Sequence, residues 1–260
     1  DEQISLIKAD IARARAEDRV VVYLSCPISS RGGGYSVTNV DIAKHTQRRL
    51  LADWGHRFWI LNPAQYQLES KEGTGLITQH AEKLKISKTE LTRLQKAHPP
   101  EGGDYMRMWT KVLVEDEEKD SRHLGRNFDA FYFLGPSDVR DFFTSGGALT
   151  VTAGIEEYFA RKFTMDPDFH RFYSTRGSKW ETQRKHFFRF YSVRASANFS
   201  LGCHDEWNIF RLINQARLDA SKKDTPPEGD TGELLSGFFD GRQITPGAAV
   251  CEVSGGYTIS

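Results

Sequence analysis

The chain has 260 residues, with 35 basic and 35 acidic side chains that give a formal net charge of zero. This balance gives no electrostatic reason to expect a nucleic-acid polymer or an anionic membrane surface as a partner. The three cysteines are widely separated and form no C-x-x-C pair, which argues against a disulfide framework and against a metal site. No apolar run approaches the roughly 20 residues of a membrane-spanning helix. We therefore expect a soluble, cytoplasmic globular protein.

The N-terminal part of the chain predicts a helix followed by a β-α-β unit. Residues 2 to about 18 carry isoleucines at helical spacing, and Val20–Ser25 is a β-branched run typical of a buried strand. A helix is predicted to end near Trp54, before Gly55, and Phe58–Pro63 reads as a second strand closed by Asn-Pro. A β-α-β unit requires a parallel sheet.

The loop after the first strand has the composition of a phosphate-binding turn. Glycines let a backbone approach a ligand, serine hydroxyls can donate hydrogen bonds, and an arginine can bind a phosphate through two parallel hydrogen bonds. A strand, a glycine-rich turn and a helix together point backbone N–H groups at an anion. The alternative is a flexible surface loop. The residues concerned are Ser25, Ile28, Ser29, Ser30, Arg31, Gly32, Gly33 and Gly34.

The middle of the chain predicts a long polar insertion and then a third strand. Residues 64–103 are interrupted by glycines and prolines, with a helix expected around Gln79–Ala97. A helix is expected from Tyr105 to about Lys119, and the strand begins at Asp129. A further helix is expected from about Ala148 to Arg161.

The C-terminal part is rich in aromatic and basic residues. Phe187–Val193 is interpreted as a strand and Glu206–Ala220 as a helix, with a flexible loop from Lys222 to Gly232. The tail 246–260 supplies either a final strand or an exposed segment. The fold class expected is α/β: a Rossmann-like parallel sheet flanked by helices, with a core over 1–165 and a C-terminal α+β extension over 166–260.

Two C-terminal motifs have both a functional and a structural interpretation. Gly202–Trp207 gathers a thiol, an imidazole and two carboxylates, but contiguous residues rarely converge on one metal ion, so we expect His204 or Asp205 to cap a helix. The stretch Trp180–Arg194 has the composition to stack bases and bind phosphates. A strand with a buried aromatic face and a basic outer face explains that stretch equally well.

The order of these motifs resembles the nucleoside 2-deoxyribosyltransferase superfamily over about residues 20–165. The similar features are Tyr23 followed by the Pro27–Gly33 loop, the Asp-led strand at Asp129, and Gly154-Ile155-Glu156-x-x-Phe159-Ala160. The segment Ile28–Gly33 is similar to the loop of the 2'-deoxynucleoside 5'-phosphate N-hydrolases. The chain is longer than these relatives, and the insertion at 64–103 and the residues after about 165 have no counterpart in them.

The resemblance implies an active site. Glu156 matches the family's glutamate nucleophile, with Glu157 as the alternative in a shifted register, while Tyr23 would lie near the sugar. Asp120, or its competitor Asp116, would contact the sugar or the base. Residues 25–34 would hold a 5'-phosphate and Asp129 would line the site. Glu156-Glu157 as a solvated helix face, and Asp129 as a turn cap, are the structural alternatives.

The function expected is cleavage of the base–sugar bond of a nucleotide. A carboxylate near an anchored phosphate suits attack on the oxocarbenium-like anomeric carbon. Water as acceptor makes the protein an N-glycosidase, and a second base makes it a transferase. NAD glycohydrolysis and a non-catalytic nucleotide sensor are the alternatives. The partner is a small nucleotide or nucleoside, with no cofactor, no nucleic-acid polymer and no membrane. The resemblance implies a homodimer.

Overall fold

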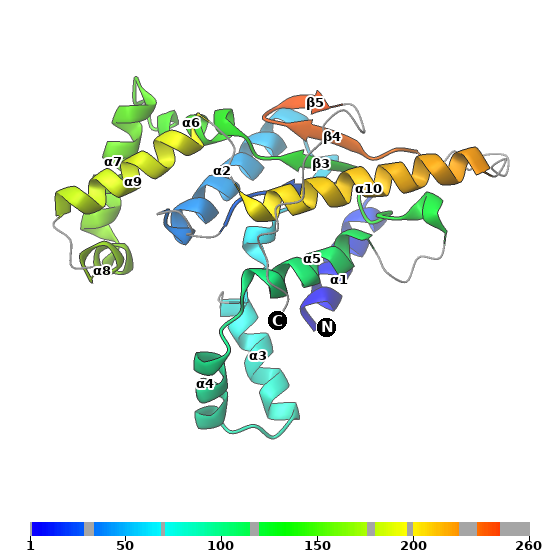
Figure 1. Ribbon diagram of the computed structural model, residues 1–260, viewed down its shortest axis with the longest axis horizontal. Helices are drawn as coiled ribbons and strands as arrows, with labels where there is room; N and C mark the ends of the chain where they lie inside the picture. Colours follow the sequence, from blue (N-terminus) through cyan, green and yellow to red (C-terminus); the bar gives the residue numbers. More distant parts are fainter. Residues whose placement is uncertain are drawn as a thin grey trace.

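The computed structural model shows an α/β protein with helices on both faces of a five-stranded, mostly parallel sheet (Figure 1). This confirms the α/β class and the parallel sheet predicted from the sequence. No helix within the described ranges is long and apolar enough to cross a membrane. The structure describes residues 2–28, 34–68, 71–114, 120–175, 180–196, 200–223 and 233–244.

The strands lie in the order β2-β1-β3-β4-β5, so the first strand in sequence is internal. Val22 of β1 lies opposite Ile60 of β2 and Ala130 of β3, and both pairings are parallel. Strand β4 pairs in parallel with β3, and only β5 is antiparallel to its neighbour. The strands are β1 (Val20–Ser25), β2 (Phe58–Leu61), β3 (Ala130–Phe133), β4 (Ser236–Phe239) and β5 (Arg242–Ile244).

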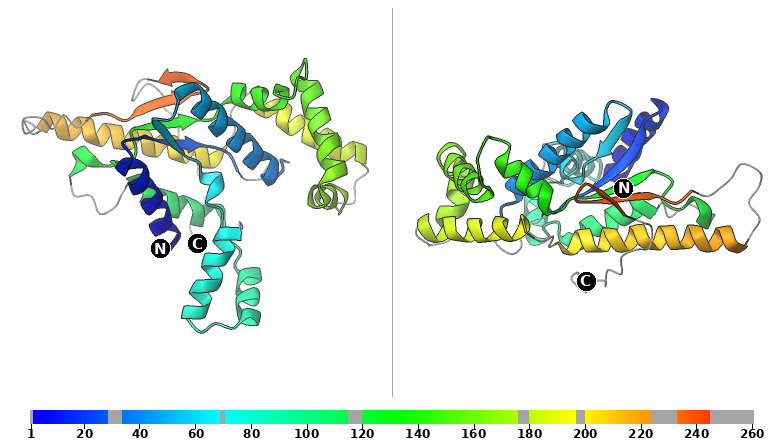
Figure 2. Two further views of the ribbon diagram at one scale, coloured as in Figure 1. Left: turned by 180° about the vertical axis from the view of Figure 1, so that it is seen from behind. Right: turned by 90° about the horizontal axis from the view of Figure 1, so that it is seen from above.

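Two layers of helices cover the sheet because side chains alternate along each buried strand. Val22 and Leu24 of β1 face one apolar cluster, and Val21 and Tyr23 face the other. Figure 2 shows α2 on one face of the sheet and α10 along the other. The first layer contains α2 (Ser36–Trp54) and α6 (Pro136–Thr144) and continues beyond the end of the sheet as α7 (Val151–Met165), α8 (Pro167–Thr175) and α9 (Trp180–Arg194) (Figure 1). The second layer contains α1 (Glu2–Ala16), α5 (Gly102–Val114) and α10 (Leu201–Lys223).

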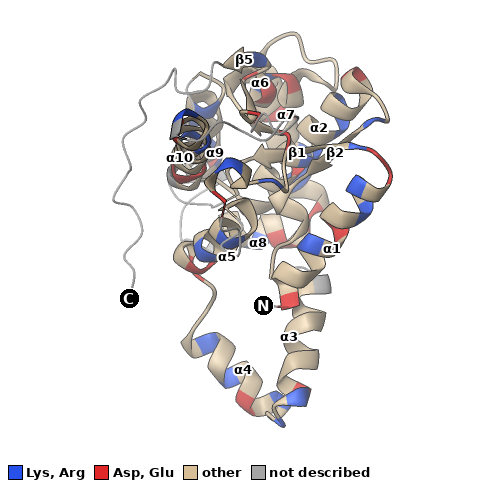
Figure 3. Cartoon of the chain, turned by 90° about the vertical axis from the view of Figure 1, so that its right-hand side faces the viewer, with Lys and Arg blue, Asp and Glu red and all other residues tan. Residues whose placement is uncertain are grey.

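The insertion after β2 forms two helices instead of the one predicted around Gln79–Ala97. Helix α3 (Lys71–Lys83) and helix α4 (Lys88–Ala97) project from the body of the molecule (Figure 3). Lys85 adopts a left-handed conformation with φ of 58°, and the Ser87 side chain accepts a hydrogen bond from the N–H of Glu90. A left-handed residue and an N-cap end one helix and begin the next, so the prediction of a continuous helix was wrong. A short 3-10 helix, η1 (Pro63–Gln65), precedes the pair.

The prediction of a strand at Phe187–Val193 was wrong, because these residues belong to α9. Phe187 and Tyr191 are fully buried and four residues apart, which places both on the same face of a helix. The Phe187 ring lies 5.0 Å from that of Phe159 on α7. Aromatic residues favour strands on average, but here packing between two helices decides the structure.

Strands β4 and β5 were not predicted, although the sequence carries a hairpin signal at Asp240-Gly241. Both residues have positive φ, 51° and 79°, as the tightest hairpin turns require. The Asp240 carboxylate also accepts hydrogen bonds from the Ser137 N–H (2.7 Å) and hydroxyl (2.9 Å) at the start of α6. Residues after 165 therefore complete the same sheet that the first 165 residues begin. The tail 246–260 lies outside the described residues.

Candidate functional site at the carboxyl end of β1

A buried carboxyl group at the carboxyl end of β1 is held by two hydroxyl groups of that strand. Tyr23 and Ser25 are two residues apart, so both side chains point to the face of the sheet that α10 covers. The Tyr23 hydroxyl donates to Oε1 of Glu206 at 2.7 Å, and the Ser25 hydroxyl donates to Oε2 at 2.5 Å. Both carboxyl oxygens are thus occupied by hydroxyls from one strand.

Burial changes the acid–base behaviour of this group. Only 6 % of Glu206 is exposed, and Tyr23 and Ser25 are fully buried. Burial raises the pKa of Glu206 from 4.5 to about 7, while the hydrogen bonds from Ser25 and Tyr23 act in the opposite direction. Burial and the neighbouring Glu206 raise the pKa of Tyr23 well above its usual range. Near neutral pH, Glu206 therefore exists in both protonation states.

Helix α10 places Glu206 because its first turns run over the end of β1. The inward residues recur at helical spacing: Cys203, Glu206 and Phe210 are all buried. The hydroxyl of Ser200 accepts a hydrogen bond from the N–H of Cys203 at 3.4 Å, which caps the helix. The prediction that His204 or Asp205 provides this cap was therefore wrong, because the helix begins at Leu201, five residues before the predicted start at Glu206.

Two buried thiols lie near this carboxyl group, and the guanidinium group of Arg194 lies near the thiols. Cys26 follows β1 directly, and its sulfur lies 3.7 Å from Oδ1 of Asn62 at the end of β2. Burial, with nearby Cys203 and Glu206, raises the pKa of the Cys26 thiol, and burial raises that of Cys203 to about 12. Both thiols are therefore protonated at neutral pH. Burial lowers the pKa of the Arg194 guanidinium, which lies in the electrostatic field of both thiols.

The predicted phosphate loop begins at this same place. Ser29, Ser30, Arg31, Gly32 and Gly33 lie outside the described residues, so their predicted role stays a prediction. On the near side of that gap, the carbonyl of Ile28 accepts a hydrogen bond from Asn39 at 3.1 Å.

On the far side, a Cβ added to Gly34 would lie 2.4 Å from the Phe190 ring. A larger residue at position 34 would therefore displace the ring of Phe190 on α9.

Glu156, the predicted nucleophile, lies elsewhere. Its carboxylate is half-exposed and pairs with Arg184 of α9 at 2.7 Å. Arg184 and Arg194 lie on the same helix, and at a rise of about 1.5 Å per residue they are about 15 Å apart along its axis. The ion pair of Glu156 is therefore separated from the part of α9 that lies near the two thiols. Glu157 is exposed on the same helix. The structure does not bring Glu156 and Tyr23 together, because α7 belongs to one helix layer and the Tyr23 side chain faces the other.

Asp120 and Asp129 precede β3, at the edge opposite the carboxyl end of β1. Asp120 caps the 3-10 helix η2 (Ser121–His123) and bonds to Arg122, which lowers the pKa of its carboxyl to about 2. Asp129 accepts a hydrogen bond from the N–H of Val21 at 2.7 Å and pairs with Arg15 at 2.7 Å. These contacts join α1, β1 and β3, which differs from the turn cap considered for Asp129 from the sequence. Asp116 lies outside the described residues.

Sequence reasoning did not select Glu206 or Arg194. The available signal was the spacing of Cys203, Glu206 and Phe210, which places the glutamate on the buried face of an amphipathic helix. A carboxyl group on such a face requires hydrogen-bonding partners, and Tyr23 and Ser25 provide them only once the chain is folded.

The described part of the chain contains no group of three or more His, Cys, Asp or Glu that could hold a metal ion. Comparisons of this chain with protein-family models, with curated proteins and with solved structures found no match. The arrangement at the end of β1 is therefore interpreted from its own chemistry.

Proposed function

We propose that the protein is a nucleotide N-glycosidase with a Rossmann-like core, and that its catalytic carboxyl group is Glu206. The observation that carries the proposal is the pair of hydrogen bonds from Tyr23 and Ser25 to Glu206 at the end of β1. The strand order β2-β1-β3-β4-β5 is that of doubly wound folds, in which ligands bind beyond the carboxyl ends of the strands next to a reversal of strand order. That reversal lies between β1 and β3.

Position favours Glu206 over Glu156 as the catalytic group. Ser25 both donates to Glu206 and begins the loop expected to bind the phosphate. Because that loop follows β1 directly in the sequence, a nucleotide bound by it would lie near the carboxyl end of β1. Glu156, in contrast, is engaged by Arg184 on the outer side of α7. A perturbed pKa beside a predicted ligand loop is typical of catalytic carboxyl groups.

The proposed reaction proceeds in two steps. In its ionised form Glu206 attacks C1' of the sugar, the bond from C1' to the base nitrogen breaks, and that nitrogen takes up a proton from solvent, which is returned when water loses a proton in the second step. Water then attacks C1' of the resulting ester, which releases the sugar phosphate and regenerates the carboxylate. The hydroxyls of Tyr23 and Ser25 orient the carboxyl group and stabilise its negative charge. Transfer to a second base would replace the water step.

The substrate class, the absence of a cofactor and the compartment are proposed as the sequence predicts them. The substrate is a small nucleotide, no cofactor takes part, and the site of action is the cytoplasm. The described cysteines, Cys26 and Cys203, are free thiols. Assembly as a homodimer stays a prediction that follows from the family resemblance alone.

The test is product analysis with matched glutamine variants. The wild-type protein, Glu206→Gln and Glu156→Gln are each incubated with ribo- and deoxyribonucleoside monophosphates, nucleosides and NAD, and released bases are separated by chromatography. We expect the wild type to release a base and Glu206→Gln to lose at least a thousandfold in rate, because the nucleophile is removed. Glu156→Gln should retain most of the activity.

Other outcomes contradict the proposal in different ways. Loss of activity in Glu156→Gln alone would support the nucleophile predicted from the sequence and refute the assignment to Glu206. Release of nicotinamide from NAD alone would change the substrate class. No release from any compound, with tight binding of one nucleotide by both variants, would indicate a nucleotide sensor.

A further inference from the structure

A concave site lies on the outer surface of α7 and α9, away from the carboxyl group of Glu206. It is a pocket of about 290 Å³, close to the lower limit of pockets that bind small molecules. It therefore suits a small ligand better than a dinucleotide. Its lining residues are Glu156, Thr182, Arg184, Lys185, His186, Phe188 and Arg189.

Helix α9 is fixed to α7 by buried aromatic rings. Phe187 and Tyr191 of α9 are fully buried, and their rings lie 4.5 Å apart. On α7, Tyr158 stacks on Phe187 at 6.1 Å and Phe159 meets the same ring at 5.0 Å. Because one face of α9 is fixed by these aromatic contacts, its remaining residues are held toward the pocket and solvent.

The charge of the lining is unbalanced. Arg184, Lys185 and Arg189 are permanent cations at neutral pH, against the single carboxylate of Glu156. That carboxylate is bound to Arg184 at 2.7 Å. Lys185 and Arg189 have no ion-pair partner among the residues that the structure describes. The aromatic ring of Phe188 adds an apolar wall.

We propose that this pocket binds a small organic phosphate, a ligand with a doubly charged phosphate group and a compact apolar or aromatic part. Arginine binds phosphate oxygens through two parallel hydrogen bonds, and lysine binds them as a point charge. Phe188 contacts the apolar part of the ligand. Glu156 competes with the phosphate for Arg184, so ligand binding opens the ion pair between α7 and α9.

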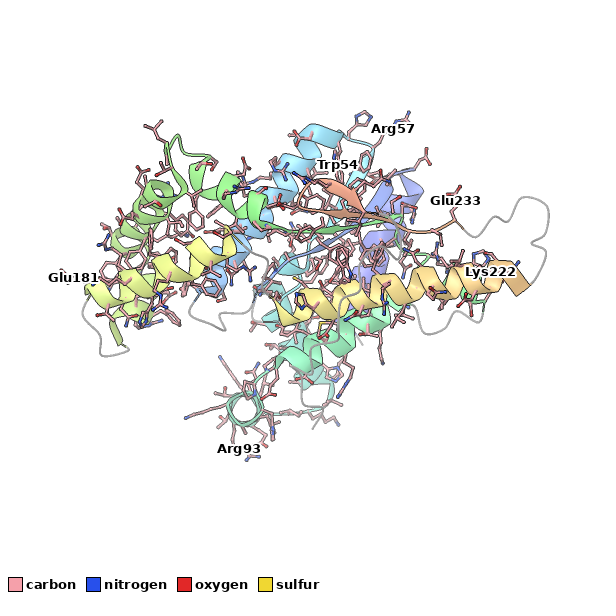
Figure 4. The ribbon with its side chains drawn as sticks, turned by 45° about the horizontal axis from the view of Figure 1, so that its top comes forward. Trp54, Arg57, Arg93, Glu181, Lys222 and Glu233 are labelled. Atoms are coloured by element: carbon pink, nitrogen blue, oxygen red, sulfur yellow. The ribbon has the colours of Figure 1, made fainter. Side chains whose placement is uncertain are left out.

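This site gives a binding role to basic and aromatic residues of 180–194 that take no part in the proposed catalytic reaction. It does not depend on the proposed function, because it is detected by binding and not by turnover. In Figure 4, Glu181 at the start of α9 lies at one end of the molecule and Lys222 of α10 at the other. Lys222 is therefore remote from the pocket and is suitable for a control substitution.

The experiment measures binding of phenyl phosphate, inorganic phosphate and phenol by titration calorimetry on the full chain. We expect phenyl phosphate to bind more tightly than inorganic phosphate, and phenol not to bind. Lys185→Ala/Arg189→Ala should weaken phenyl phosphate binding about tenfold or more, because charge-assisted hydrogen bonds are lost. The control Arg57→Ala/Lys222→Ala removes the same two charges at exposed, remote positions and should leave the affinity unchanged.

Substitution of the competing carboxylate gives a second, opposite expectation. Glu156→Gln should tighten phenyl phosphate binding about two- to fivefold, as expected for loss of a half-exposed ion pair. Equal weakening in the pocket and control double variants would overturn the proposal, since binding would then reflect net charge only. Weaker binding in Glu156→Gln would overturn the competition. Tighter binding of a single-stranded oligonucleotide, lost in the pocket variant, would refute a small-molecule ligand.

Discussion

Replacing Glu206 by glutamine should make the protein more stable at high pH and leave its stability nearly unchanged at low pH. The carboxyl group titrates near pH 7 in the folded protein, against 4.5 for the ordinary group. At about 1.4 kcal/mol for each pH unit, ionising the buried group costs the folded state about 3 kcal/mol. Glutamine is nearly isosteric and does not titrate.

The sign of the effect follows from proton binding. Below about pH 4.5 the group is protonated in both the folded and the unfolded chain, and no penalty arises. Between pH 4.5 and about 7 the folded protein binds the proton more tightly, so wild-type stability falls as pH rises. Above pH 7 the penalty is complete. The advantage of Glu206→Gln should therefore grow from near zero at pH 4.5 to about 3 kcal/mol at pH 8, less the cost of altered hydrogen bonds.

The measurement is urea unfolding followed by circular dichroism at pH 4.5, 5.5, 6.5, 7.5 and 8. The difference between variant and wild type is used, because the titration of all other groups cancels. Glu156→Gln, at a half-exposed carboxylate, is the matched control and should show no gain of this size. A difference between Glu206→Gln and wild type that stays constant across this range would refute the assignment of the raised pKa to Glu206.

Removing the hydroxyl group of Tyr23 or of Ser25 tests the hydrogen-bonding partners of Glu206. Tyr23→Phe and Ser25→Ala each delete a hydrogen bond that lowers the pKa of Glu206. Each should therefore raise the upper end of the pH window of lost stability in the same unfolding titration, while the lower end, which the unfolded chain sets, stays near pH 4.5. An upper end that moves downward would contradict the hydrogen-bond geometry.

Three further substitutions test the packing of the fold. Gly154→Ala should destabilise the protein by about 1–3 kcal/mol in a thermal melt, because the added Cβ would lie 2.1 Å from the carbonyl oxygen of Phe143. The control Gly146→Ala has open space around the added Cβ and should be nearly neutral in the same measurement. Gly241→Ala should cost about 1 kcal/mol by urea unfolding, since φ at this turn is +79°; an unchanged midpoint would show that the hairpin turn is not formed as described. Phe187→Ala should cost about 3–5 kcal/mol and lower the melting temperature, because the ring is fully buried between two helices.

Local patterns were sufficient for the first part of the sheet. The β-branched run Val20–Ser25, the stop at Gly55 and the Asn-Pro after Leu61 mark a strand, the end of a helix and a second strand, and all three lie where the sequence places them. These signals depend on neighbouring residues only. For this reason the β-α-β unit and the α/β class follow from the chain alone.

Local patterns gave a wrong prediction where the same amino-acid composition is compatible with both a strand and a helix. The aromatic and basic residues of 187–193 fit a strand or a helix, and contact with Phe159 on α7 decides for the helix. The hairpin that begins β5 had a local signal at Asp240-Gly241, but its place beside β3 depends on a pairing over about a hundred residues. Local propensity carries no information on such a partner.

What the sequence determined by itself is the class of fold and the position of a glycine-rich loop at the end of the first strand. Only the tertiary structure decided which carboxyl group lies at the end of that strand. Glu206 meets Tyr23 and Ser25 across 181 or more residues of chain, while Glu156 pairs with Arg184 on the surface. A carboxyl group acquires a pKa near neutrality from burial and from its partners, and both are properties of the folded chain.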